Sequence, residues 1–376
     1  MKELVTLFLK LGSTAFGGPA AHIAMMEEEI VRKRNWISHE HFLDLLGATN
    51  LIPGPNSTEM AIHIGYVRAG WKGLLAAGAA FILPSLIITL LIAHLYVTYG
   101  SVPQLGSFIT GVRAAIIAVI AGAVFRLGKP VLKKPAMAIL GGLVLILNLL
   151  GLDEILLLFL AALGGLAWSY RGHARQKGFL GAPGFFLLAA PASAHLAVNS
   201  ASLAGLGLFF LKIGSILYGS GYVLVAYLQA GLVDARHWLT HEQLLDAIAV
   251  GQFTPGPVSS SATFIGYLIL GVPGAAVATA GIFFPSFVFV LISSPFIPKL
   301  RKSALLSGFL DGASAASLGL MLSVTIVLAG SSLTSAGSWA ICLAAVVAII
   351  LWNLNIAWIV AGAALLGWLL STVRWL

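Results

Sequence analysis

Phe8-Leu9-Lys10-Leu11-Gly12-Ser13 returns almost unchanged as Phe210-Leu211-Lys212-Ile213-Gly214-Ser215, 202 positions further along the chain. The same offset aligns residues 34–44 with residues 236–246 without a gap. Ungapped matching of separated stretches indicates an internal duplication. We therefore predict that the chain consists of two similar halves.

The composition is that of a membrane protein. Of the 376 residues, 59% are hydrophobic and 9% are charged, and the mean hydropathy is +0.99. A soluble domain carries about 25% charged residues, so this composition excludes a soluble fold. Apolar stretches of about 20 residues, the length of a membrane-crossing helix, recur from end to end. The first of them lacks a small-residue cleavage site, so we expect it to stay in the mature protein.

The apolar stretches predict an all-α polytopic membrane protein with six segments in each half. In the first half the segments cover residues 4–26, 42–66, 70–98, 106–127, 133–150 and 153–170, and in the second half 203–230, 244–269, 272–297, 305–328, 336–351 and 354–373.

Pro53-Gly54-Pro55 and its copy Pro255-Gly256-Pro257 interrupt the second segment of each half. Neither arm, at about ten residues and 1.5 Å per residue, can cross a hydrocarbon core of roughly 30 Å. We predict a re-entrant helical hairpin, which leaves about five transmembrane helices per half. An odd number of crossings gives the two repeats inverted topology.

The basic residues support inversion. With the N-terminus outside, fifteen of the 21 Lys and Arg residues fall on the cytoplasmic side, as the positive-inside rule requires. The formal net charge of +8 therefore indicates membrane lipid rather than nucleic acid as the partner. We predict a first repeat over residues 1–177, a linker at 178–199 and a second repeat over 200–376. The apolar stretch 178–198 is read as an interfacial connector, with an additional crossing as the alternative.

The Pro-Gly-Pro breaks are the first candidate binding site. In transporters with inverted repeats, the N-termini of interrupted helices supply backbone N–H groups to an anion at mid-membrane. Hydroxyl and amide side chains after each break would add ligands. The alternative is that they only cap the re-entrant helices. The predicted substrate-binding residues are Pro53, Gly54, Pro55, Asn56, Ser57, Thr58, Pro255, Gly256, Pro257, Ser259 and Ser260.

A second pair of breaks, Gly17-Gly18 and Gly219-Ser220, interrupts the first segment of each half. Lys10 and Lys212 lie shortly before these breaks at equivalent positions, and charges inside a membrane are functional suspects. We predict that all six residues bind the anion, with snorkelling of the two lysines to the interface as the alternative.

Four further ionisable side chains are candidates. Arg113 is predicted to bind substrate, and Asp311 to couple protons, although an ion pair between them across the repeat interface would also account for both. Glu59 and His63 have no ionisable counterparts at Ser261 and Ile265. Because a desolvated carboxyl and a histidine titrate near neutral pH, we predict a role in proton coupling, with a hydrogen bond at the membrane edge as the alternative.

No cofactor or metal is predicted. The single cysteine, Cys342, excludes disulfides within the chain and cysteine-based metal or redox sites. The chain also lacks a His-Glu-x-x-His motif and a nucleophile elbow. A membrane-embedded enzyme using Glu59 and His63 and a passive scaffold are the competing readings from other classes.

The motifs Phe16-Gly17-Gly18-Pro19, Arg34-Asn35-Trp36, Gly251-Gln252-Phe253-Thr254-Pro255-Gly256-Pro257 and Phe284-Pro285-Ser286 resemble the chromate ion transporter family in its fused, two-domain form. Ser220 departs from the glycine expected there, which leaves substrate choice less defined than fold.

The resemblance implies a multi-pass protein of the bacterial or archaeal inner membrane that exports chromate, driven by the proton motive force. Sulfate is implied as a competing oxyanion and protons as a coupled partner. A second copy of the chain is a further candidate partner, in a homodimer. A transporter of sulfate or another divalent anion is the alternative.

Overall fold

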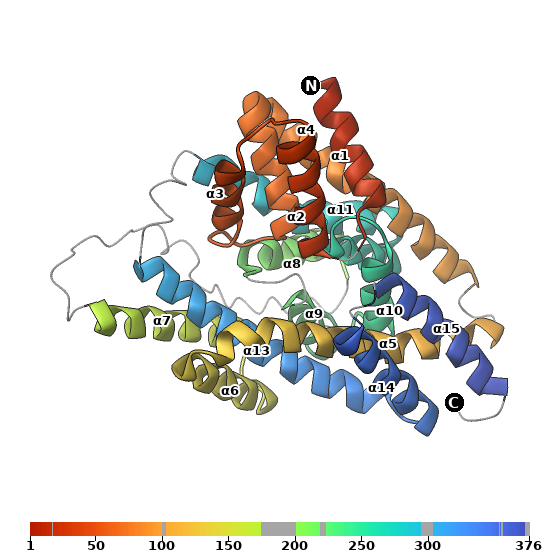
Figure 1. Ribbon diagram of the computed structural model, residues 1–376. Coiled ribbons are helices and arrows are strands. Elements are labelled where there is room, and N and C mark those ends of the chain that lie inside the picture. The colour runs from red at the N-terminus through yellow and green to blue at the C-terminus, as the bar shows by residue number, and fades with distance from the viewer. Residues whose placement is uncertain are drawn as a thin grey trace.

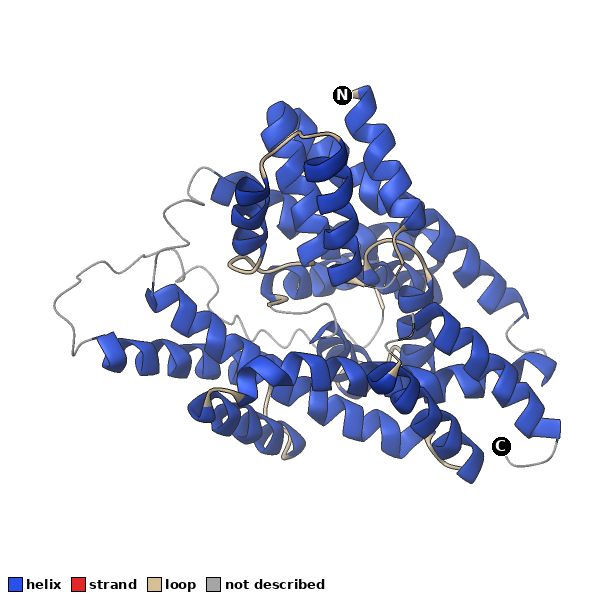
Figure 2. Cartoon of the chain, in the orientation of Figure 1, coloured by secondary structure: helices blue, strands red, loops and turns tan. Residues whose placement is uncertain are grey.

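A computed structural model describes residues 1–16, 18–99, 103–173, 201–218, 223–294, 304–352, 354 and 356–372. The described residues form helices joined by short loops, without strands (Figure 2). Gly17, Gly219, Ser220 and the predicted linker 178–199 lie outside them.

The first half contains α1 (Lys2–Thr14), α2 (Pro19–Glu27), the π-helical turn η1 (Glu28–Lys33), α3 (His39–Thr49), α4 (Asn56–Tyr99), α5 (Pro103–Leu132), α6 (Pro135–Leu149) and α7 (Glu154–His173). The second half contains α8 (Leu203–Ile216), α9 (Leu224–Leu228), η4 (Gln229–Asp234), α10 (His241–Phe253), η5 (Val258–Ser260), α11 (Ser261–Ser293), α13 (Ala304–Ser332), α14 (Ala336–Leu351) and α15 (Ile356–Thr372).

Four helices of the described part are long and apolar enough to cross a membrane, namely α4, α5, α11 and α13. Local sequence explains where several helices begin. The Ser38 hydroxyl accepts from the His41 amide at the start of α3, and Thr240 forms a capping box with Gln243 at the start of α10. These caps satisfy amides that the helix itself leaves unpaired.

Both α4 and α11 reverse direction near their first third. A side-chain carbon on Gly78 would contact Ile62, although 16 residues of straight helix would separate them by about 24 Å. The reversal lies at Ala69–Gly70, where Gly70 has φ +58°. The predicted segments 42–66 and 70–98 are therefore joined by a tight turn inside one continuous helical stretch.

The second half copies this turn closely. Leu270 and Gly271 have φ/ψ of −137°/23° and 63°/−152°, against −150°/28° and 58°/−151° for Ala69 and Gly70. Asn35 and His237, which the offset of 202 makes equivalent, share a positive φ of 49° and 53°. The duplication seen in the sequence is thus present in the backbone.

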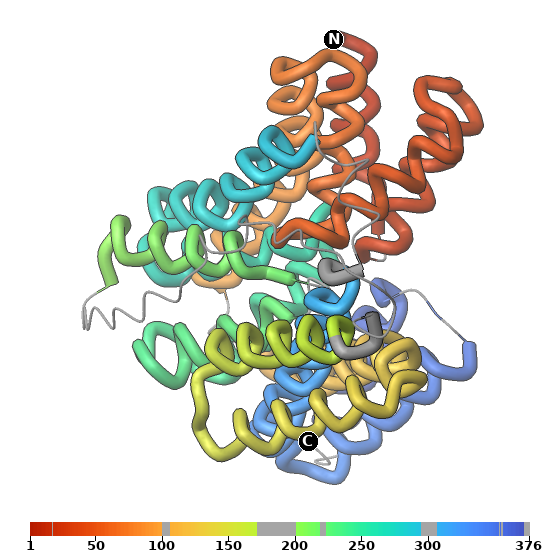
Figure 3. The backbone as a smooth tube through the Cα atoms, turned by 90° about the vertical axis from the view of Figure 1, so that its left-hand side faces the viewer, coloured from red at the N-terminus to blue at the C-terminus, as the bar shows by residue number. Residues whose placement is uncertain are grey.

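The halves exchange helices. α5 of the first half packs against α14 and α15 of the second, and α13 of the second packs against α6 and α7 of the first (Figures 1 and 3). Gly111 on α5 lies against the backbone of Ala363 and Gly367. Its equivalent Gly312 on α13 lies against Ala161. Small residues allow such close approach of helices without a hydrophobic driving force.

The exchanged helices form one side of the molecule and α1–α4 the other, with α8 and α11 between them (Figures 1 and 3). α4 and α11 pack against each other. Both Pro-Gly-Pro loops precede these helices, which brings the loops into the contact between the halves.

Candidate functional site

Each Pro-Gly-Pro loop is hydrogen-bonded to the other half. The Gly54 N–H donates to the Leu217 carbonyl at 2.8 Å, and the Gly256 N–H donates to the Ala15 carbonyl at 2.9 Å. Ala15 and Leu217 are equivalent residues at the ends of α1 and α8. The loop of each half therefore donates the same backbone hydrogen bond to the equivalent carbonyl of the other half.

Both loop glycines are required by their surroundings. Gly54 has φ +149° and Gly256 φ +94°, a region that favours glycine. A side-chain carbon on Gly54 would overlap the Glu59 carboxylate and lie 2.5 Å from the Ser286 hydroxyl oxygen. On Gly256 it would lie 2.8 Å from Cβ of Ser85. Ser85 on α4 and Ser286 on α11 are thus each placed against the loop of the opposite half.

Polar side chains around the two loops are buried without hydrogen-bond partners. They are Thr58, Glu59, Ser85, Ser259, Ser260 and Ser286, each at most 1% exposed. An unsatisfied buried polar group costs about 1–3 kcal/mol. η5, which carries Ser259 and Ser260, packs against α4 of the first half. Such a concentration of unpaired polar groups is the composition expected of a site that receives a polar ligand.

Glu59 is the carboxylate of this cluster, and it is fully buried. The Ser286 hydroxyl lies beside it, but neither carboxylate oxygen makes a hydrogen bond of good geometry within the described residues. His63, one turn further along α4, has Nδ1 3.3 Å from the Ser294 hydroxyl and an unpaired Nε2. The structure therefore places Glu59 against the first Pro-Gly-Pro loop and His63 against the C-terminal end of α11.

The remaining loop residues are also buried or bonded locally. Pro53, Gly54, Pro55 and Ser57 are buried, as are Pro255, Gly256 and Pro257. Asn56 donates from Nδ2 to the Asn50 side chain at 2.8 Å. Gly18, with φ +82°, precedes α2 as its N-cap.

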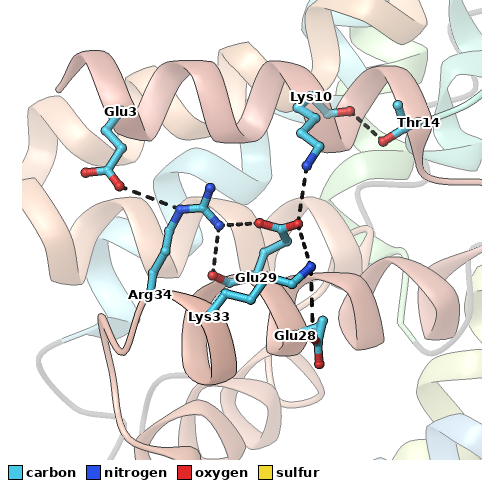
Figure 4. A network of polar contacts seen from close by, with 7 residues as sticks. All are labelled: Glu3, Lys10, Thr14, Glu28, Glu29, Lys33 and Arg34. Carbon is cyan, nitrogen blue, oxygen red and sulfur yellow. Dashed lines mark hydrogen bonds and ion pairs between the residues drawn. The ribbon is translucent and has the colours of Figure 1, made fainter.

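Lys10 and Lys212 interact with carboxylates outside the Pro-Gly-Pro loops. The Lys10 ammonium is 3.3 Å from Glu29, which also binds Lys33 and Arg34, and the Lys10 side chain is 60% exposed (Figure 4). Lys212 is exposed on α8 and interacts electrostatically with Glu154 at the start of α7.

Arg113 and Asp311 do not pair with each other, so the alternative of an ion pair between them is wrong. Arg113 makes a bidentate contact with Asp246 on α10, at 2.8 and 2.7 Å, and the Tyr96 hydroxyl donates to the same carboxylate at 2.6 Å. Asp311 binds Lys134 at 2.5 Å. Arg113 therefore does form an ion pair between the two halves, but its partner is Asp246 rather than Asp311.

Sequence reasoning missed three residues here. Asp246 was visible as a charge within the apolar segment 244–269, but it was used only as the repeat partner of Asp44. Ser85 and Ser286 were visible as the matched pairs Pro84-Ser85 and Pro285-Ser286, which support the repeat, and Ser286 also as part of the family motif Phe284-Pro285-Ser286. Neither was predicted to bind substrate.

The family model for chromate transporters matches residues 2–166 and again residues 204–368. The chain belongs to the chromate transporter family. It is similar to the chromate transport protein of Cupriavidus metallidurans, with 35% identity covering 98% of this chain and 92% of that protein. It is also similar to a probable chromate transport protein of Synechococcus elongatus, with 32% identity and coverage of 89% and 86%. No solved structure matches.

Family membership and the four long apolar helices identify a multi-pass membrane protein. This chromate transporter family member carries both loops and every residue of the unpaired cluster inside the matched regions. The predicted linker 178–199 falls between the two matches.

Proposed function

We propose that the chain is a secondary active transporter of chromate, with sulfate as a competing oxyanion. The observation that carries the proposal is the cluster of buried, unpaired hydroxyls contributed by both halves around two Pro-Gly-Pro loops. A tetrahedral dianion without a proton accepts hydrogen bonds only, and hydroxyl groups and helix N-termini can donate to it.

The ligands in this proposal come from the loops and the helix starts that follow them. α4 and η5 begin directly after the two Pro-Gly-Pro loops, so their positive ends favour an anion there. Lys212, exposed on α8, acts as a surface charge that attracts the anion over a distance, whereas the charge of Lys10 is balanced by Glu29. Arg113, neutralised by Asp246, holds the two halves together.

We propose an inverted arrangement of the two repeats, with boundaries at 1–177 and 200–376 and a linker at 178–199. α3 has 11 residues and a length of about 16 Å, too short to cross a membrane, which supports a re-entrant hairpin of α3 and the first arm of α4. In a chain with Cys342→Ala, Lys33→Cys and Arg236→Cys should react with a membrane-impermeant maleimide from opposite sides. Labelling of both from one side would contradict inversion.

We propose export from the cell across the inner membrane, driven by the proton motive force. Moving one charge through 100 mV is worth about 2.3 kcal/mol, so an inside-negative potential favours outward movement of a dianion. Protons would be exchanged at the buried Glu59, next to His63. Asp311 is a weaker candidate for this role because Lys134 already binds it.

Flux in proteoliposomes tests the function. The purified full-length protein is reconstituted, and uptake of chromate and of labelled sulfate is measured with and without a pH gradient and a potential. We expect saturable flux of chromate that sulfate inhibits. Flux of neither anion above that of empty vesicles would contradict the proposal. Flux of sulfate that chromate does not inhibit would favour a transporter of sulfate or another divalent anion.

A further inference from the structure

Ser85 and Ser286 occupy equivalent places in the two halves. Each follows a proline in the part of a long helix, α4 or α11, that comes after the reversal, and each is fully buried. The Ser85 side chain lies against Gly256, and the Ser286 side chain lies against Gly54. Each hydroxyl is therefore carried by one half and sits on the Pro-Gly-Pro loop of the other.

The hydroxyls do not make the hydrogen bond that helical serines and threonines commonly make. Such side chains usually donate to the carbonyl four residues earlier, and in this protein Thr279 and Thr325 do so at 2.7 and 2.6 Å. Ser85 donates to no acceptor in the described part of the chain. The Ser286 hydroxyl lies beside the Glu59 carboxylate, but not with the geometry of a well-formed hydrogen bond.

The carbonyls that such a bond would use pack against neighbouring helices. The carbonyls four residues earlier belong to Phe81 and Ile282, and these carbonyls face the glycines Gly12 and Gly214 of the neighbouring α1 and α8. Each serine is left as a donor turned towards the opposite loop rather than back along its own helix. Burying two such donors without acceptors is costly, so a ligand that accepts hydrogen bonds would recover this energy.

We propose that Ser85 and Ser286 are a pair of substrate-binding hydroxyls, one from each half, that donate to the same oxyanion. The inference rests on the proposed function and names two ligands that the Pro-Gly-Pro motifs alone do not supply. Because each serine also touches the other half's loop, anion binding draws the two halves together around the substrate.

Transport kinetics test the pair. Ser85→Ala, Ser286→Ala and the double variant are compared with Thr325→Val, which removes a buried hydroxyl that bonds within its own helix. A hydrogen bond to a charged ligand contributes enough for about a tenfold effect. We expect the KM for sulfate and chromate to rise about tenfold in each single variant and further in the double variant. Thr325→Val should stay within about twofold of the unmodified protein.

A second measurement does not depend on transport. Ser85→Cys and Ser286→Cys are made in a Cys342→Ala chain, and thiol labelling is followed with and without sulfate. Sulfate is the probe because chromate oxidises thiols. We expect sulfate to slow labelling at both positions. Equal labelling rates with and without sulfate, or an unchanged KM in the double variant, would show that Ser85 and Ser286 do not bind the substrate. The proposed function fails separately, if the unmodified protein transports neither anion.

Discussion

Glu29 is the carboxylate that joins α1 to η1 (Figure 4). It binds Arg34, Lys33 and Lys10. The hydrogen bond from Arg34 is the main reason that the pKa of Glu29 is lowered to about 2, against an opposing effect of burial, and the two lysines lower it further. The charged form is therefore the one that stabilises the fold.

Glu29→Gln should lower stability by about 1–3 kcal/mol, because three cations lose the negative charge that they share. The sign of the pH effect follows from the lowered pKa. Stability from this group is fully present above about pH 4.5 and is lost as pH falls towards 2. Thermal unfolding followed by tryptophan fluorescence from pH 7 to 3 should show a smaller acid loss in the variant. An acid loss equal to that of the unmodified protein would contradict the role of Glu29.

Glu59→Gln tests proton coupling at a single residue. A dianion and an ionised Glu59 cannot both occupy a dry site cheaply, so the carboxyl must be neutral when the anion is bound. The variant keeps the neutral state permanently. We expect anion exchange to persist while stimulation by a pH gradient falls about tenfold or more.

Asp311→Asn is the matched control, because its carboxylate is bound to Lys134. Vesicle flux at several pH gradients measures both variants. If Asp311→Asn lost the pH dependence and Glu59→Gln retained it, the assignment would be reversed.

Candidate residues of the site can be proposed from the sequence, but their partners cannot. Pro53-Gly54-Pro55, Glu59 and the hydroxyls after the breaks were identified from local pattern, because a break in an apolar segment is a local property. The partners of Lys10 and Arg113 depend on how distant helices pack. Glu29 lies 19 residues from Lys10, and Asp246 lies 133 residues from Arg113, so no spacing in the sequence indicates either pair.

At the scale of elements, the tight reversal in α4 depends on two glycines in backbone contact. A side-chain carbon on Gly65 would overlap the Gly73 carbonyl, which cannot rotate away. Gly65→Ala should destabilise the protein by about 3 kcal/mol, at the upper end of the cost of overpacking. Gly142→Ala on α6 meets open space and should be neutral or slightly stabilising, as alanine favours helix.

Unfolding temperature in detergent compares the two variants. Equal shifts in both would contradict a packing role for Gly65. The apolar segments on either side of this turn were predicted from hydropathy alone. The turn itself was not, because Ala69–Gly70 lies in a short stretch that reads equally well as a loop between separate helices.

At the scale of the whole molecule, the two halves complete each other. α5 is covered by α14 and α15, while α13 is covered by α6 and α7. The internal repeat was predictable because duplication leaves identical residues at a fixed offset. The exchange was not, because the sequence does not record which copy of a helix packs against which.

This exchange predicts how residues 1–177 and 200–376 behave when they are expressed as separate chains. Alone, the first half would expose Arg113 without Asp246, and an unpaired arginine at the bilayer centre costs about 2.5–3.5 kcal/mol or more. The Gly111 and Gly312 faces would lose their close backbone contacts as well. We expect each half alone to aggregate or be degraded, and the two co-expressed halves to co-purify with an affinity tag on one of them.

Asp246→Asn in the second half should weaken that co-purification, whereas Asp153→Asn, at the exposed loop before α7, should not. A monodisperse, protease-resistant first half on its own would show that the exchange is not needed for folding.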